Sequence, residues 1–113
     1  MSLYNAQVLY GTVTAGGSIS SAYDLNQYST VAIETPGTIA GTTLAFRHGS
    51  NINNGTLTGA LIVNDSAGNL LSVSAAASRV ITDVPELAPL RYISLVMGGG
   101  TQATDAIFKL WVK

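Results

Sequence analysis

His48 is the single histidine of the 113-residue chain, so any histidine-dependent catalysis or metal site would have to use it. A strand pattern ends just before it, and segment 48–57 is mostly Gly, Asn, Ser and Thr, a composition typical of turns and exposed loops. No acidic or nucleophilic partner stands at a useful spacing. We therefore expect His48 to be a solvated loop residue.

The carboxylates of Asp83 and Glu86 are close enough in sequence to share general acid–base work. Pro85 lies between them and indicates a surface turn instead. The many serines include no Gly-x-Ser-x-Gly elbow, the motif that exposes a serine nucleophile in one large class of hydrolases. We expect no catalytic residue and no enzymatic activity.

Two polar or glycine-rich stretches resemble ligand loops only in part. Gly98-Gly99-Gly100 has neither the following Lys-Ser/Thr nor the helix start that would hold a phosphate, and it is better interpreted as a flexible hairpin connection. Segment 64–69 offers oxygen ligands but lacks the distal Glu of a calcium loop, which favours a turn. We expect no cofactor and no metal.

The charge content of the chain is low. Only 10% of residues are charged, against about a quarter in typical soluble domains, while 47% are hydrophobic. The five basic residues are scattered and the net charge is −1, so binding to nucleic acid or to an anionic membrane is disfavoured. A surface with so few charges suggests that part of it is covered in an assembly.

The length of the chain suits one domain, 1–113, whose core must form without disulfides because there is no cysteine. Residues 1–6 are expected to form an extended arm. The amino end shows neither the basic segment nor the apolar run of a signal peptide, so we expect synthesis in a host cytoplasm.

Strand signals recur along the chain, and helical periodicity is almost absent. Gly, Asn, Asp or Pro closes each signal, and Asp65-Ser66-Ala67-Gly68 is well suited to a β-hairpin connection. About eight short strands of this kind describe an all-β sandwich or barrel. The expected strands are 7–14, 18–24, 30–35, 42–47, 60–64, 69–74, 90–97 and 105–112, and 79–82 is expected to form at most a brief edge strand.

The last strand places apolar residues on both of its faces. Ala106, Phe108, Leu110 and Val112 form one face, while the other places Trp111 and Ile107 among charged residues. Aromatic side chains of this kind dominate protein interfaces. The candidate interface residues are therefore Trp111, Ile107, Tyr4 and Tyr10; Trp111 either packs beneath a loop of its own subunit or lies between subunits.

Two stretches of the chain carry a resemblance to a known family. The first reads Ser20-Ser21-Ala22-Tyr23-Asp24-Leu25, Tyr28, Val31-Ala32-Ile33, Pro36 and Ala40-Gly41-Thr42-Thr43-Leu44-Ala45-Phe46. The second reads Arg79-Val80-Ile81, Asp83 and Leu90-Arg91-Tyr92-Ile93-Ser94-Leu95, before a Gly/Thr/Gln loop and a closing hydrophobic strand. From about residue 18 to 112 the chain resembles small structural proteins of tailed-bacteriophage virions. Segment 48–57 departs from that pattern because it is longer than the polar stretch of related chains.

This resemblance implies a capsid decoration or cement protein, with an antiparallel two-sheet, jelly-roll-like sandwich fold. Such a protein lies on the capsid surface of the virion, in many copies over the seams between major capsid protein subunits, and it has no substrate. The expected partners are the major capsid protein and further copies of the chain, as a dimer or trimer.

Two other functions stay open at this stage. One is a tail, neck or fibre-associated module of the virion. The other is a carbohydrate-binding β-sandwich, in which Trp111 and the tyrosines would stack on sugar rings.

Overall fold

The structure is a computed structural model that describes residues 7–26, 28, 31–82, 84–87 and 89–113. It is all-β apart from one short 3-10 helix, η1 (Pro85–Leu87), within these ranges. The prediction of an all-β chain is confirmed. The strands are β1 (Gln7–Val13), β2 (Tyr23–Asp24), β3 (Val31–Glu34), β4 (Thr43–Gly49), β5 (Asn51–Asn53), β6 (Thr56–Thr58), β7 (Leu61–Ile62), β8 (Ser72–Ser74), β9 (Val80–Ile81), β10 (Tyr92–Gly98) and β11 (Ala106–Val112).

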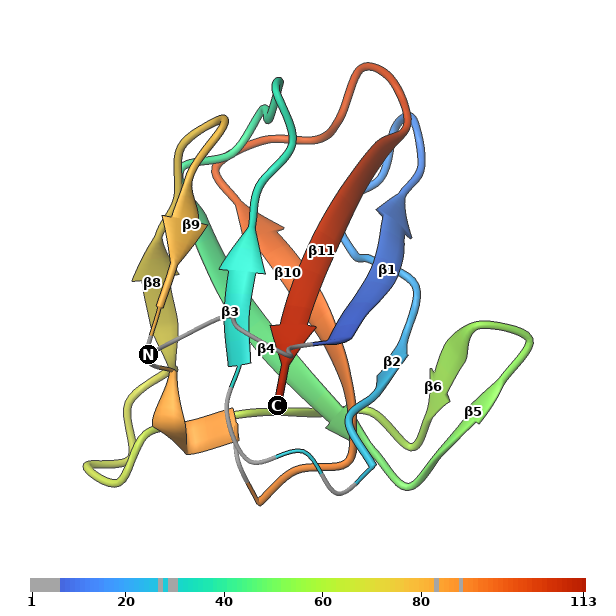
Figure 1. Cartoon of the computed structure of the whole chain (residues 1–113), viewed down its shortest axis with the longest axis vertical. Helices are drawn as coiled ribbons and strands as arrows, with labels where there is room; N and C mark the ends of the chain where they lie inside the picture. Colours follow the sequence, from blue (N-terminus) through green and yellow to red (C-terminus); the bar gives the residue numbers. More distant parts are fainter. Residues whose placement is uncertain (1–6, 27, 29–30, 83, 88) are drawn as a thin grey trace.

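Most strands belong to two antiparallel sheets. Sheet A has the order β1-β11-β3-β9, and sheet B has the order β2-β10-β4, with β7 and β8 both paired to the far side of β4. In Figure 1 the strands β1, β11 and β3 cross in front of β10 and β4. A separate two-stranded sheet, β5-β6, projects to one side of the molecule.

The pairing of the strands is nested along the chain. The first strand, β1, pairs with the last, β11, and β2 pairs with β10. In the same way β3 pairs with β9, and β4 pairs with β7 and β8. The contacts β11-β3 and β10-β4 then complete the two sheets. Strands from the first half of the chain therefore pair with strands from the second half in reverse order, as in one long hairpin that is folded into two sheets.

The expectation of a hairpin between β10 and β11 is wrong. These strands belong to different sheets, and the connection containing Gly99 and Gly100 crosses from one sheet to the other. Each strand has one strongly apolar face, and the buried residues of both belong to a single hydrophobic cluster. Two such faces bury more apolar surface when they meet across the core than when they lie side by side in one sheet.

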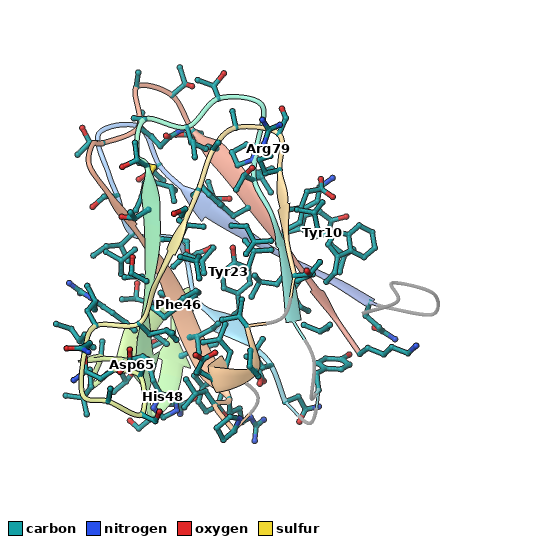
Figure 2. The ribbon with its side chains drawn as sticks, turned by 90° about the vertical axis from the view of Figure 1, so that its left-hand side faces the viewer. Tyr10, Tyr23, Phe46, His48, Asp65 and Arg79 are labelled. Carbon is teal, nitrogen blue, oxygen red and sulfur yellow. The ribbon has the colours of Figure 1, made fainter. Side chains whose placement is uncertain are left out.

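The core confirms the alternation expected for the long strands. Ile93, Leu95 and Met97 of β10 are buried together with Phe108 and Leu110 of β11. Figure 2 shows Phe46 and Tyr23 inside the molecule, whereas Tyr10 points away from it. The buried phenol of Tyr23 donates a hydrogen bond to the backbone C=O of Phe108, 2.8 Å away. Gly11 makes room for that ring, because a side chain at this position would overlap it.

Segment 48–57 does not form the exposed loop that its composition predicts. β4 continues to Gly49, and β5 and β6 then form a hairpin. Its turn residues Asn54 and Gly55 both have positive φ, 52° and 77°, as a two-residue type I′ hairpin requires. The Asn-Gly dipeptide is the sequence signal for this hairpin. The segment was interpreted as a loop because most of its residues are polar or glycine.

The hairpin predicted around 65–68 forms only at its turn, because β7 and β8 each pair with β4 and not with each other. Asn64 and Leu70 form an antiparallel bridge, and the Asp65 carboxylate accepts hydrogen bonds from the backbone N–H groups of Ala67 and Asn69. The predicted strand 18–24 is shorter than expected, since only β2 and an isolated bridge between Ile19 and Val96 form there.

Gln102 joins three loops at one end of the molecule, and no sequence motif marks it. It is 3% exposed, and its side-chain oxygen accepts from the Ala40 N–H at 2.7 Å while its amide donates to the C=O of Thr38. Its backbone pairs with Gly16 and Gly17. The β10-β11 connection is therefore attached to two other connections.

Candidate functional site

The outer face of sheet A brings together three of the four predicted interface residues. Tyr10 and Trp111 belong to the paired strands β1 and β11, and Ile107 lies two residues from Lys109, the partner of Tyr10. Residues two apart on a strand share a face, so the register places all three side chains on one surface. Tyr10 is 60% exposed and Ile107 is 50% exposed. Tyr4, the fourth predicted residue, lies outside the described residues.

One carboxylate orients the centre of this face. Glu34 of β3 accepts a hydrogen bond from the Trp111 indole N–H at 3.1 Å through Oε1, and its Oε2 lies 3.4 Å from the Lys109 ammonium. Lys109 and Glu34 are also directly opposite in the register of β11 and β3. The indole ring, which is partly exposed, therefore has a fixed orientation beside a neutralised pair of charges.

A shallow hollow of about 450 Å³ extends this face toward β9. Ile107 and Lys109 line one side of it, and Arg79 and Val80 line the other. Val80 is 50% exposed, and the exposed Arg79 side chain has no ion pair or hydrogen bond within the described ranges. The face thus combines exposed apolar side chains with one uncompensated positive charge at its edge.

Sequence reasoning missed Glu34 and Val80 as parts of this surface. The alternation in 30–35 does separate Glu34 from Ile33, and that signal identifies a face of one strand. It does not reveal which strand lies alongside. The contact between Glu34 and Trp111 spans 77 residues, so it depends on the register of β3 with β11.

The residues considered for catalysis are not assembled into a site. His48 is not the loop residue expected: it belongs to β4, is half-buried, and pairs in register with Ile93 and Leu61. Glu86 is exposed on η1, and Asp83 lies outside the described residues. Across the described ranges no group of three or more His, Asp or Glu residues is placed to hold a metal ion. No helix there has the length and apolarity to cross a membrane.

No protein-family model matches the chain, and no curated protein matches it. One solved structure is similar, the crystal structure of the SPBc2 prophage-derived protein YomS, with 14% sequence identity and a TM-score of 0.49. The similarity covers 96% of this chain and 95% of that one. Similarity of this degree assigns neither a family nor a function.

Proposed function

We propose that this chain is a non-catalytic structural protein of a tailed-bacteriophage virion, which binds the assembled major capsid shell as a decoration or cement protein. The observation that supports binding is the outer face of sheet A. Tyr10 and Ile107 are exposed beside an ordered Trp111, on a sheet face that a lone domain would be expected to cover with polar groups. The choice of the capsid as partner rests on the sequence resemblance described above.

The physical character of this face suits a protein contact. Trp and Tyr contribute large contact areas with few rotatable bonds, so little conformational entropy is lost on binding. The bond from Trp111 to Glu34 already fixes the ring, and the adjacent Lys109 neutralises the carboxylate. A partner loop with an apolar residue for the hollow and an acidic residue for Arg79 would complement the surface.

We also propose that sheets A and B are the two layers of a jelly-roll sandwich. The strand order supports this, because a jelly roll is an eight-stranded double sheet built from two Greek keys. Counting β7 and β8 as one interrupted strand and leaving the inserted β5-β6 hairpin aside, eight strands form two four-stranded layers with nested pairing.

Two alternative functions, a tail, neck or fibre module and a carbohydrate-binding domain, differ from the proposed one in where the protein is found and in how Trp111 is used. A tail, neck or fibre module would use the same face on a different part of the virion. A sugar-binding site at Trp111 would need an open aromatic face. Trp111 is partly buried and its N–H is bonded to Glu34, so its surroundings favour a protein contact.

The proposal is tested by binding to purified capsids that were assembled without this protein. We expect saturable co-sedimentation with assembled capsids and none with unassembled capsid protein. Ile107→Lys should weaken binding by roughly tenfold or more, because it places a charge in the buried centre of the contact. The self-association of each variant is measured first by light scattering, since a dimer or trimer through sheet A would compete for the same face.

Ile62→Lys is the matched control. Ile62 is 65% exposed on β7, at the edge of sheet B, so the substitution changes charge and hydrophobicity equally at a site outside the proposed contact. An equal loss of capsid binding in Ile107→Lys and Ile62→Lys would contradict the proposal, as would the absence of binding between the wild-type protein and assembled capsids.

A further inference from the structure

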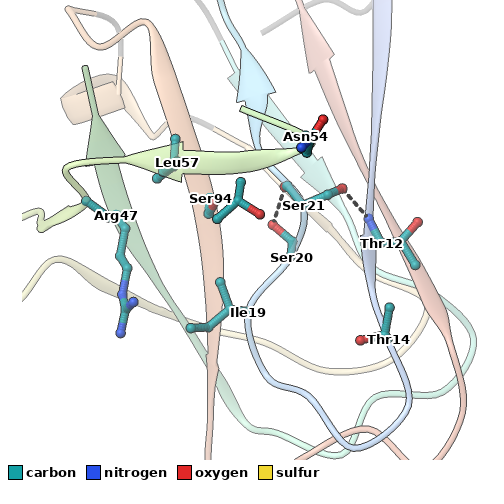
Figure 3. A pocket seen from close by; sticks show the side chains of 12 residues that line it. Thr12, Thr14, Ile19, Ser20, Ser21, Arg47, Asn54, Leu57 and Ser94 are labelled. Atoms are coloured by element: carbon teal, nitrogen blue, oxygen red, sulfur yellow. Dashed lines mark hydrogen bonds between the residues drawn. The ribbon is translucent and has the colours of Figure 1, made fainter. Parts of the chain in front are cut away.

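A second hollow, of about 490 Å³, lies beneath the β5-β6 hairpin, over the outer face of sheet B and the adjoining end of β1 (Figure 3). The hairpin is held over it by a hydrogen bond from the Ala22 N–H to the Gly55 C=O, 2.8 Å long. We call this hollow the hairpin groove. It is lined by Thr12, Thr14, Ile19, Ser20, Ser21, Arg47, Asn54, Gly55, Thr56, Leu57, Ala60 and Ser94.

Hydroxyl groups dominate the polar lining of the hairpin groove, and two of them are fixed by the backbone. The Ser20 hydroxyl accepts from the Leu95 N–H and donates to the Ser21 C=O, both at 2.9 Å. The Ser21 hydroxyl accepts from the Thr12 N–H at 3.0 Å, which leaves its own proton available. These contacts give the groove a defined shape before any ligand enters.

Ser94 is the residue that points to a ligand. It alternates with the core residues Ile93 and Leu95 of β10, so its side chain faces the groove. The residue as a whole is only 3% exposed, and its hydroxyl makes no hydrogen bond within the described part of the chain. No fully buried side-chain oxygen lacks a partner there, so the Ser94 hydroxyl is open to the groove and can donate to or accept from a ligand.

Among the described residues that line the groove, Arg47 is the only charged one, and none is acidic. It lies opposite Ser94 in the register of β4 and β10. Its guanidinium has no ion pair or hydrogen bond to any described residue. Figure 3 shows Arg47 at one end of the groove and Thr12 at the other. The groove therefore has a cationic end and a hydroxyl-rich end.

We propose that the hairpin groove binds an acidic sugar, a uronic or sialic acid residue. The floor of the groove is a sheet face whose backbone groups are already paired, so it offers side chains rather than a strand edge that a peptide could extend. Hydroxyl groups that both donate and accept match the ring hydroxyls of a sugar. Arg47 meets the carboxylate, and Ile19 and Leu57 pack against the ring carbons. The volume is that of a small-molecule site.

The test is an amide-resonance titration of the whole protein with methyl glucuronide, methyl sialoside and the neutral methyl glucoside. We expect an acidic glycoside to shift amides of 12–21, 54–57 and 94, and to bind roughly tenfold or more tightly than the neutral one, as for a charge-assisted hydrogen bond. Arg47→Gln should remove that difference, and Ser94→Ala should weaken binding. Arg79→Gln, which removes a cation on sheet A, is the matched control and should bind as the wild type does.

Three results would overturn the proposal: equal binding of acidic and neutral glycosides, shifts outside the groove, or no shift with any of the three glycosides at tens of millimolar. A short acidic peptide that shifts the groove amides when the acidic glycosides do not would likewise overturn it, by assigning the groove to a protein partner. Arg47→Gln should leave capsid binding intact, so this proposal and the proposed function fail independently.

Discussion

Tyr23 shows how a single side chain connects the two sheets. It belongs to β2 of sheet B, and its phenol crosses the core to bond the backbone of β11 in sheet A. Burial raises the pKa of Tyr23 well above the ordinary tyrosine value of about 10, because the phenolate would lose its hydration inside the protein. The folded state therefore retains the phenol proton at a pH where the unfolded chain has lost it.

This difference predicts alkaline instability. Below pH 10 the residue is neutral in both states, so it adds no pH dependence. Above about pH 10 the unfolded chain releases the proton and the folded chain does not, so the free energy of unfolding should fall by about 1.4 kcal/mol per pH unit. Urea unfolding at a series of pH values between about pH 8 and about pH 12 measures the slope.

Tyr23→Phe is the informative variant for this prediction. It should lower the free energy of unfolding by about 1 kcal/mol near neutral pH, because the hydrogen bond is lost. Above about pH 10 it should also remove the fall of about 1.4 kcal/mol per pH unit that Tyr23 causes. Tyr10→Phe alters an exposed ring and should retain that slope. An unchanged slope in Tyr23→Phe would show that another group is responsible.

The sequence predicts the position of a single side chain only where that position follows from the alternation of residues along one strand. The pattern of β11 correctly placed Trp111 and Ile107 opposite the core residues Phe108 and Leu110. The partner of Trp111 was not accessible, since Glu34 reaches it only through the pairing of strands distant in sequence. Ser94 was also missed, because a serine on a mostly apolar strand gives no sign that a hairpin covers it.

At the scale of elements, the β5-β6 hairpin depends on its turn. Gly55 has a φ of 77°, and an L-residue in this conformation is disfavoured by about 1 kcal/mol. Gly55→Ala should therefore make hydrogen exchange of the Ala22 and Ser50 amides roughly fivefold faster, because both donate to residues of the hairpin.

Gly37→Ala is the control for this experiment. Gly37 lies in a loop without positive φ, and an added methyl group there meets only the Ser78 hydroxyl at 4.0 Å. Exchange at Ala22 and Ser50 should stay at the wild-type rate. If Gly55→Ala also leaves it unchanged, the hairpin is held by something other than its turn.

Gln102 acts at the same scale, between loops. Gln102→Ala leaves the N–H of Ala40 and the C=O of Thr38 without their side-chain partner, and we expect a loss of about 1–3 kcal/mol in the free energy of unfolding. Gln7→Ala, which changes a glutamine at the exposed start of β1, should cost much less. Comparable losses from the two substitutions, measured by urea unfolding, would contradict this role.

At the scale of the whole molecule, the sequence indicates strands and their inward faces but not the sheet to which each belongs. The β10 and β11 segments look like a hairpin because they are adjacent and both apolar, yet they lie in opposite sheets. The nested pairing of β1 with β11 and β2 with β10 joins the two ends of the chain. No local periodicity contains that information, because it arises from burying both apolar faces against each other.

We propose different roles for the outer faces of the two sheets. Sheet A presents Tyr10, Ile107 and Trp111 for a protein partner, while sheet B carries the hairpin groove with Arg47 and Ser94.

The most direct measurement is cryo-electron microscopy of virions that contain this protein, with its density traced on the particle. We expect copies across the junctions of capsid subunits, with the outer face of sheet A against the shell and Trp111 enclosed in the contact. Density confined to the tail, or copies on the shell with Tyr10, Ile107 and Trp111 facing solvent, would contradict it.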